Sequence, residues 1–148
     1  MANEAIYAYG TQKTLEASGA SFASGTLLQA NDAAYSTDTD GAGFPDAVFV
    51  LKIQFGTTTS IENKAVSLFA RPLNIDGTND APVPTATYTE KFIGAFVLSA
   101  SAASTDQYLA IEAYNLPKEA EYYIANGSGQ VASAGWSLKV TPRSYKPS

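Results

Sequence analysis

Residues 47–55 read Ala-Val-Phe-Val-Leu-Lys-Ile-Gln-Phe, and this stretch decides the fold class. Every second residue from Phe49 to Phe55 is a large apolar residue, while Lys52 and Gln54 occupy positions in between. A period of two residues is typical of a β-strand with one buried face, whereas an amphipathic helix repeats every ~3.6 residues. Gly56 and the three threonines that follow it end the strand.

The same alternation recurs along the chain and predicts further strands. The segments that show it are 66–70, 108–114 and 136–140, and 122–124 is predicted as a further short strand. Pro142 is expected to end the last of these strands, because proline cannot donate to a sheet ladder. Nowhere do apolar residues recur at helical spacing over the length of a helix. We therefore predict an all-β protein, a single antiparallel β-sandwich or jelly roll.

The segment 92–98 is apolar on both faces of its predicted strand. In a regular strand Phe92 and Phe96 point one way. Ile93 and Val97 then point the other way. Such a strand is either covered on both sides or faces a partner. We therefore expect Ile93 and Val97 to contribute to an interface.

The composition excludes several classes of functional site. The 148 residues fit one domain that is large enough to bury a core without metal or disulfides. The sequence contains no cysteine and no histidine. This excludes thiolate nucleophiles, disulfides, His-ligated zinc and the Ser-His-Asp triad. We expect no cofactor.

The charge and the N-terminal sequence argue against nucleic acid and membranes as partners. The net charge is −5 at pH 7 and only 16% of the residues are charged, whereas phosphate binding needs clustered Lys and Arg. No apolar run approaches the ~20 residues of a membrane span. Residues 1–7 lack the basic and apolar regions of a signal peptide. We therefore expect synthesis in a cytoplasm.

The chain divides into three predicted parts. They are an N-terminal arm with weak strands (1–45), a β-sandwich core (46–142) and a C-terminal tail (143–148). The first part is rich in Ala, Ser, Gly and Thr, with short apolar pieces at 6–9 and 26–28. Two interpretations stay open. This part is either an N-terminal strand with long loops of the same domain, or an arm that reaches a neighbouring subunit.

Two acidic segments resemble fragments of calcium-binding loops. Asp38 and Asp40 lie two residues apart before Gly41, and Asp76 and Asp80 belong to a second cluster of oxygen-bearing side chains. Turn formation is the alternative, because Asp and Asn side chains bond to their own backbone in loops. We favour turns over metal binding at both places.

Paired carboxylates are the remaining candidates for catalysis, since glycoside hydrolysis needs two of them across a cleft. The candidates by residue type are Glu90, Glu112, Glu119 and Glu121. Glu119 and Glu121 lie beside a lysine in a predicted turn, which is typical of solvated charge. Glu112 lies on a strand face with Tyr108 and Tyr114. We predict that the protein is not an enzyme.

Tyrosine is abundant, with nine residues against seven Phe and one Trp. Exposed tyrosines anchor protein interfaces or stack on sugar rings. Tyr108 and Tyr114 are the candidates for a sugar platform, whereas most other tyrosines lie at element ends or in the arm and tail, where an interface fits better. The predicted interface residues are Ile6, Tyr7, Tyr9, Leu27, Leu28, Tyr35, Ile93, Val97 and Tyr145.

Five segments carry a resemblance to a known class of protein. They are 71–80, 83–84, 114–117, 121–126 and 134–142. Together they look like a small β-rich virion protein of tailed bacteriophages, similar in role to capsid decoration (cement) proteins. Such proteins bind the shell as oligomers. The resemblance implies a structural role and supplies no catalytic residue.

We therefore expect a non-enzymatic capsid decoration protein on the surface of a virion, which binds between capsomers and stabilises the shell. Its expected partners are the major capsid protein and further copies of itself, as a dimer or trimer. Residues 3–35 and 142–147 are expected to make these contacts. Two alternatives stay open: a tail, neck or baseplate structural protein, and a carbohydrate-binding module for attachment to a host or to mucus.

Overall fold

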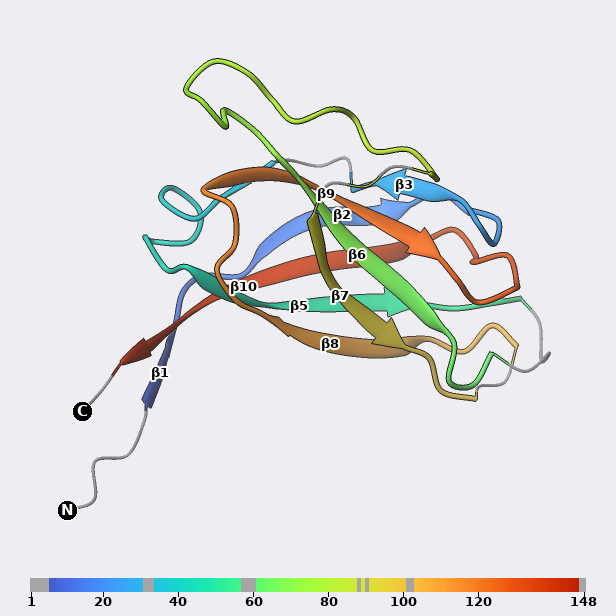
Figure 1. Ribbon diagram of the computed structural model, residues 1–148. Coiled ribbons are helices and arrows are strands. Elements are labelled where there is room, and N and C mark those ends of the chain that lie inside the picture. Colours follow the sequence, from blue (N-terminus) through green and yellow to red (C-terminus); the bar gives the residue numbers. More distant parts are fainter. Residues whose placement is uncertain are drawn as a thin grey trace.

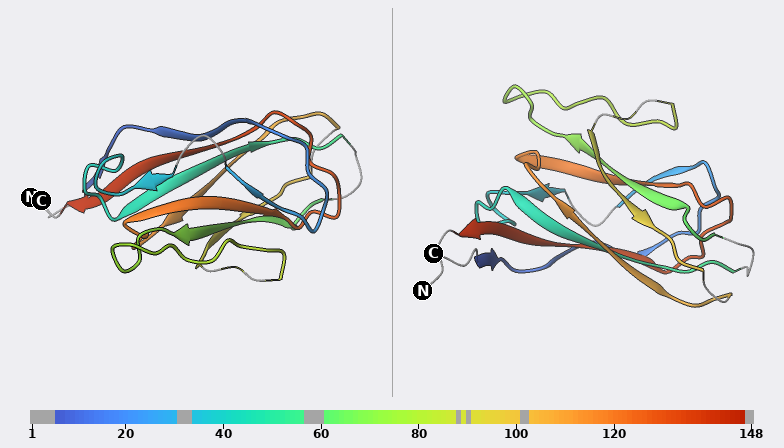
Figure 2. Two further views of the ribbon diagram at one scale, coloured as in Figure 1. Left: turned by 90° about the horizontal axis from the view of Figure 1, so that it is seen from above. Right: turned by 60° about the horizontal axis from the view of Figure 1, so that its bottom comes forward.

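The computed structural model is an antiparallel β-sandwich, which confirms the predicted fold class (Figure 1). The structure describes residues 6–30, 34–56, 61–87, 89, 91–100 and 103–146. Two five-stranded sheets form the layers, which pack face to face (Figure 2). The described part of the chain contains no helix that is long and apolar enough to cross a membrane.

One layer, which we call the β10 sheet, has the strand order β1-β10-β5-β8, and β2 also pairs with β10. Its strands are β1 (Ile6–Tyr9), β2 (Lys13–Gly19), β5 (Asp46–Ile53), β8 (Gln107–Ala113) and β10 (Trp136–Lys146). The other layer, the β9 sheet, has the order β3-β9-β6-β7, and β4 also pairs with β9. Its strands are β3 (Leu27–Gln29), β4 (Tyr35–Ser36), β6 (Ala65–Pro72), β7 (Lys91–Val97) and β9 (Glu119–Asn126).

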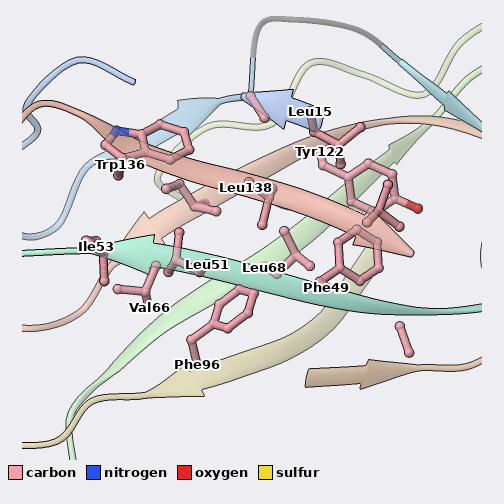
Figure 3. Close-up of a cluster of buried hydrophobic side chains, with 14 of the residues drawn as sticks. Leu15, Phe49, Leu51, Ile53, Val66, Leu68, Phe96, Tyr122, Trp136 and Leu138 are labelled. Atoms are coloured by element: carbon pink, nitrogen blue, oxygen red, sulfur yellow. The ribbon is translucent and has the colours of Figure 1, made fainter. Parts of the chain in front are cut away.

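The core lies between the sheets and consists mainly of the alternating residues that the sequence pattern predicts (Figure 3). These side chains are inaccessible or nearly so: Phe49, Leu51, Ile53, Val66, Leu68, Ala70, Phe96, Tyr122, Ile124, Trp136, Leu138 and Val140. Burying one large side chain of this kind stabilises the fold by about 1.5–3 kcal/mol. Alternation along four strands therefore supplies much of the driving force for folding.

β7 departs from the regular strand that the sequence predicts. Its register against β6 skips Ile93, so that Phe92 pairs with Phe69. The extra residue is a β-bulge, which moves the preceding side chain onto the other face. Phe92 is therefore 57% exposed and packs edge-on against Phe69, with ring centroids 5.6 Å apart. The prediction that Phe92 and Phe96 share a face is wrong for this reason.

Pro142 does not end the last strand, contrary to the prediction, because β10 continues to Lys146. The carbonyl oxygen of Pro142 accepts a hydrogen bond from Gly10 N at 2.9 Å. In an antiparallel ladder the N–H and C=O of one residue point to the same side. The missing N–H of Pro142 therefore faces Gly10, where the neighbouring strand changes from β1 to β2. The strand continues although the reciprocal hydrogen bond to Gly10 O is missing.

Over its described residues, the N-terminal third is part of the sandwich. β1 and β2 join the β10 sheet, whereas β3 and β4 join the β9 sheet. Leu15 of β2 and Tyr35 of β4 are completely buried in the common core. This part of the chain therefore shares its hydrophobic core with the later strands.

Trp136 anchors the start of β10 against β2. Its indole Nε1 donates a hydrogen bond to Ala20 O at 2.8 Å. The indole covers Gly19 so closely that a Cβ atom there would lie 2.0 Å from Trp136 Cε2. Phe22 packs against the same indole, with ring centroids 5.8 Å apart. A residue larger than glycine at position 19 therefore displaces the tryptophan.

We predict that Gly19→Ala lowers the free energy of unfolding by about 2 kcal/mol or more, because it overpacks the site of Trp136. Gly56→Ala is the matched control, since the nearest atom to an added Cβ is 3.9 Å away. That variant should stay within about 0.5 kcal/mol of the wild type. Denaturant unfolding followed by the fluorescence of the single tryptophan measures both. Equal stability of the two variants would contradict this packing.

Candidate protein-binding face

One end of the β10 sheet is a two-stranded ribbon formed by β1 and the last residues of β10 (Figure 1). β5 pairs with β10 as far as Arg143, opposite Asp46. β1 continues to pair with β10 as far as Lys146. Within the part of the chain that the structure describes, the ribbon beyond Arg143 therefore has no third strand. Unpaired strand edges offer main-chain N–H and C=O groups to another chain.

Four tyrosines surround Arg143 on the outer face of this end of the sheet. In the ladder Tyr7 lies opposite Tyr145, and Tyr9 lies opposite Arg143. Side chains at alternate positions of paired strands share one face. Tyr114, which follows β8, reaches the same place through its hydroxyl. We call these five residues the tyrosine face.

Arg143 is the centre of the tyrosine face and is only 3% exposed. Its Nη1 donates to Glu112 Oε1 at 2.9 Å, and its Nη2 donates to the Tyr114 hydroxyl at 3.2 Å. That hydroxyl in turn donates to Glu112 Oε2 at 2.8 Å, which closes the network. The guanidinium carbon lies 4.3 Å from the centre of the Tyr7 ring. Arg143 is therefore held by an ion pair below a tyrosine ring.

Both charged groups of this network are favoured in their ionised forms. Hydrogen bonds from Arg143 and then from Tyr114 hold the pKa of Glu112 below its usual value of 4.5. The Glu112 carboxylate, together with the hydroxyls of Tyr9 and Tyr114, raises the pKa of Arg143 above its usual range. A buried cation is tolerated only when it is paired. The contact with the Tyr7 ring adds about 0.5–2 kcal/mol of attraction.

The tyrosine rings remain accessible although their positions are fixed by contacts. Tyr7, Tyr9, Tyr114 and Tyr145 are between 40% and 60% exposed. Tyr7 and Tyr145 meet edge to face, with ring centroids 6.0 Å apart. Tyr and Arg are the residues most enriched at the centres of protein interfaces. The face can therefore bind a protein surface with a small loss of side-chain entropy.

The ribbon brings together four of the nine residues that the sequence predicts as interface residues. They are Ile6, Tyr7, Tyr9 and Tyr145. Tyr7, Tyr9 and Tyr145 belong to the tyrosine face. Ile6 is 56% exposed and, by the alternation of β1, lies on the other side of the ribbon.

The other five predicted interface residues lie elsewhere. Val97 is 58% exposed on β7, and Leu27 lines a groove on the outer face of the β9 sheet. Leu28 and Ile93 are partly buried against the core. Tyr35 has to be corrected, because it is completely buried and cannot contact a partner. Its burial raises the pKa of its hydroxyl to about 12.

Two of the four aspartates considered as calcium ligands form ion pairs with lysines. Asp40 Oδ2 lies 2.8 Å from Lys13 Nζ, and the same carboxylate accepts a hydrogen bond from Ser36 N. Asp38 Oδ2 lies 3.0 Å from Lys118 Nζ. Among the described residues, no three or more Asp and Glu side chains gather to hold a metal ion.

The other two aspartates shape the loop after β6. Hydrogen bonds from the Asn79 side chain and from the backbone of Asn79 and Thr78 lower the pKa of Asp76 to about 2. Asp80 Oδ1 accepts a hydrogen bond from Asn74 N at 3.0 Å. Such contacts to nearby backbone N–H groups are typical of Asp in turns and loops.

The carboxylates considered for glycoside hydrolysis have structural partners where they are described. Glu119 and Glu121 lie in β9, so their prediction as turn residues is wrong. Glu121 Oε2 lies 2.9 Å from Arg71 Nη1, and Glu119 accepts a hydrogen bond from an asparagine of the neighbouring loop. Glu112 belongs to the network of the tyrosine face. Glu90 lies outside the described residues.

Arg143 lies within the contact range 142–147, but it is absent from the nine interface residues predicted individually, although it organises the tyrosine face. The signal exists in the sequence, since steps of two from Lys139 lead to Arg143 and Tyr145 on one face of β10. This alternation is missed when Pro142 is expected to end the strand. The contact with Glu112 comes from the pairing of distant strands, and no local pattern indicates it.

Comparisons with models of protein families, with curated proteins and with solved structures found no match for this chain. No family therefore supplies functional residues from relatives. The function has to be argued from the geometry of the tyrosine face and from the sequence.

We predict that Arg143→Met returns the pKa of Glu112 towards 4.5, because the main cause of its depression is lost. A depressed carboxyl pKa contributes stability that is present above the unfolded-state pKa and lost as the pH falls through the folded-state pKa. The stability difference between wild type and variant should therefore shrink on acidification. Carboxyl NMR titration measures the pKa, with Arg143→Lys as the charge-conserving control. An unchanged Glu112 pKa in Arg143→Met would contradict the network.

Proposed function

We propose that this protein is a non-enzymatic structural protein that binds other protein subunits through the tyrosine face. Its proposed role is to decorate and stabilise the capsid of a tailed bacteriophage by binding between capsomers. The observation that carries the proposal is the exposed cluster of tyrosines held in place by the buried Arg143. The resemblance of the sequence to capsid decoration proteins supplies the identity of the partner.

The ribbon offers two kinds of contact to a partner. The tyrosine rings supply apolar area that is already ordered, so that little conformational entropy is lost on binding. The edges of the ribbon supply main-chain groups for strand addition, in which backbone hydrogen bonds give affinity and flanking side chains give specificity. A capsid subunit with an exposed strand edge can make both kinds of contact, with the tyrosine rings and with the edge of the ribbon.

Low charge favours burial of this surface against a neighbour. Residues 6–9 read Ile-Tyr-Ala-Tyr and carry no charged side chain. Docking β1 therefore does not bury an unpaired ion, which would oppose binding. A symmetric shell repeats the same contact many times, and linked copies then gain affinity through multivalency. The proposed partners are the major capsid protein and further copies of this chain.

The state of the carboxylates supports a binding role over a catalytic one. A general acid in glycoside hydrolysis needs a raised pKa. The pKa of Glu112 is instead lowered by its ion pair. Glu121 pairs with Arg71 and hydrogen-bonds to the Tyr123 hydroxyl. Both glutamates act here as partners of arginine.

The test is co-sedimentation of the purified protein with undecorated capsids. We expect saturation at a fixed ratio that follows the symmetry of the shell. The double variant Tyr7→Ala/Tyr145→Ala should bind at least about tenfold more weakly, since tyrosines at interface centres commonly contribute more than 1 kcal/mol each. The matched control is Phe92→Ala/Val97→Ala, which removes exposed apolar side chains from β7 in the other sheet.

Two results would overturn parts of this proposal. Full binding by the double tyrosine variant, with loss in the β7 control, would assign capsid binding to the β9 sheet. No sedimentation with shells, together with binding to purified tails, would replace the decoration role by that of a tail, neck or baseplate protein. Thermal unfolding of each variant shows whether it is folded.

A further inference from the structure

A groove of about 550 Å³ crosses the outer face of the β10 sheet, on the central part of the sheet. It is lined by residues of the four strands β2, β10, β5 and β8 and of the turn before β2. Lys139, one of its lining residues, precedes Arg143 by four residues along β10, which is about 13 Å in a strand. The groove and the tyrosine face are therefore separate places on one face.

The register arranges the groove residues in two rows across the sheet. In the first row Tyr108, Lys52 and Ser137 lie opposite one another on β8, β5 and β10. In the second row Val50 lies opposite Lys139, which lies opposite Thr14. The short side chains Val50 and Ser137 form the floor between longer ones. An extended ligand can therefore lie across several strands.

The groove combines an aromatic wall with neutral hydrogen-bonding groups. Tyr108 is 70% exposed, the most of any large apolar or aromatic side chain among the described residues. Gln12, Thr14 and Ser137 supply an amide and two hydroxyls along the groove. An open aromatic ring beside polar groups suits a ligand that has both an apolar ring face and hydroxyls.

The charge of the groove is positive in a protein that is acidic as a whole. Lys52 and Lys139 line it, and none of its lining residues is an acid. The net charge of the chain is −5, so the charge of these two ammonium groups is opposite in sign to the net charge of the protein. Lys52 Nζ is 3.9 Å from Asp106 Oδ2. Lys139 has no ion-pair partner among the described residues, so its charge is available for an anionic ligand.

We propose that this groove binds an acidic oligosaccharide. One sugar ring stacks on Tyr108, and a carboxylate on a neighbouring ring pairs with Lys139, with Lys52 between them. Regular strand spacing places Tyr108 and Lys139 about 12 Å apart at their Cα atoms. This distance exceeds one sugar ring, so the ligand has at least two. The proposal uses none of the residues of the tyrosine face and does not depend on capsid binding.

The test is an NMR titration of the folded protein with 3′-sialyllactose and with trigalacturonic acid. Their uncharged counterparts are lactose and the methyl ester of trigalacturonic acid. We expect saturable shifts at Tyr108, Ser137 and Lys139 with at least one of the two acids, and at least fivefold weaker binding of its uncharged counterpart. Affinity should fall when salt is raised, because the lysine contacts are exposed.

Variants separate the parts of the site. Tyr108→Ala should weaken binding at least tenfold, and Lys139→Gln should weaken it and reduce its salt dependence. Tyr145→Ala is the matched control and should bind like the wild type, since it removes an exposed tyrosine from the tyrosine face. Three outcomes would overturn the proposal: no saturable binding of either acid, equal loss in Tyr145→Ala, or tighter binding of hexaglutamate than of both saccharides, which would indicate an acidic peptide.

Discussion

The alternation of side chains along β10 is the constraint on which the rest of the structure depends. β10 pairs with β1, β2 and β5, so its register fixes most of one sheet. Its inward residues Trp136, Leu138 and Val140 belong to the core. By the same alternation Lys139 and Arg143 lie on the outer face. A slip of one residue in the register of β10 would move its core residues to the outer face and its outer residues into the core. The register therefore determines both the packing of the core and the side chains on the outer face.

The outer face of the β10 sheet carries one buried cationic side chain, Arg143, and one exposed one, Lys139. An ion pair, a hydroxyl and a ring compensate Arg143 for part of the water that it loses, whereas its Nε has no hydrogen-bond partner. Lys139 lines a groove that is open to solvent. The same sheet can therefore present a rigid, tyrosine-rich end and a polar, positive centre, each suited to a different class of partner.

Local alternation predicts the sandwich and much of its core, because the alternating apolar residues of segments such as 47–55 show which side chains of a strand are buried. The bulge at Ile93 and the passage of β10 through Pro142 depend on the neighbouring strands, which no local pattern reveals. β2 escapes prediction because Leu15 is its only side chain in the hydrophobic core, so that no alternation of apolar residues marks the strand. Tyr7, Tyr9 and Tyr145 are predictable as exposed aromatic residues at element ends. Their arrangement around Arg143 requires the pairing of β1 with β10.

We propose that the outer face of the β10 sheet is the binding surface of this protein. Hydroxyl-radical footprinting of the protein, free and bound to undecorated capsids, compares the two sheets in one experiment. We expect that oxidation of Tyr7, Tyr9 and Tyr145 falls on binding, while oxidation of Phe92 and Val97 on the other sheet is unchanged. Protection of Phe92 and Val97, with the three tyrosines still oxidised at the rate of the free protein, would contradict it.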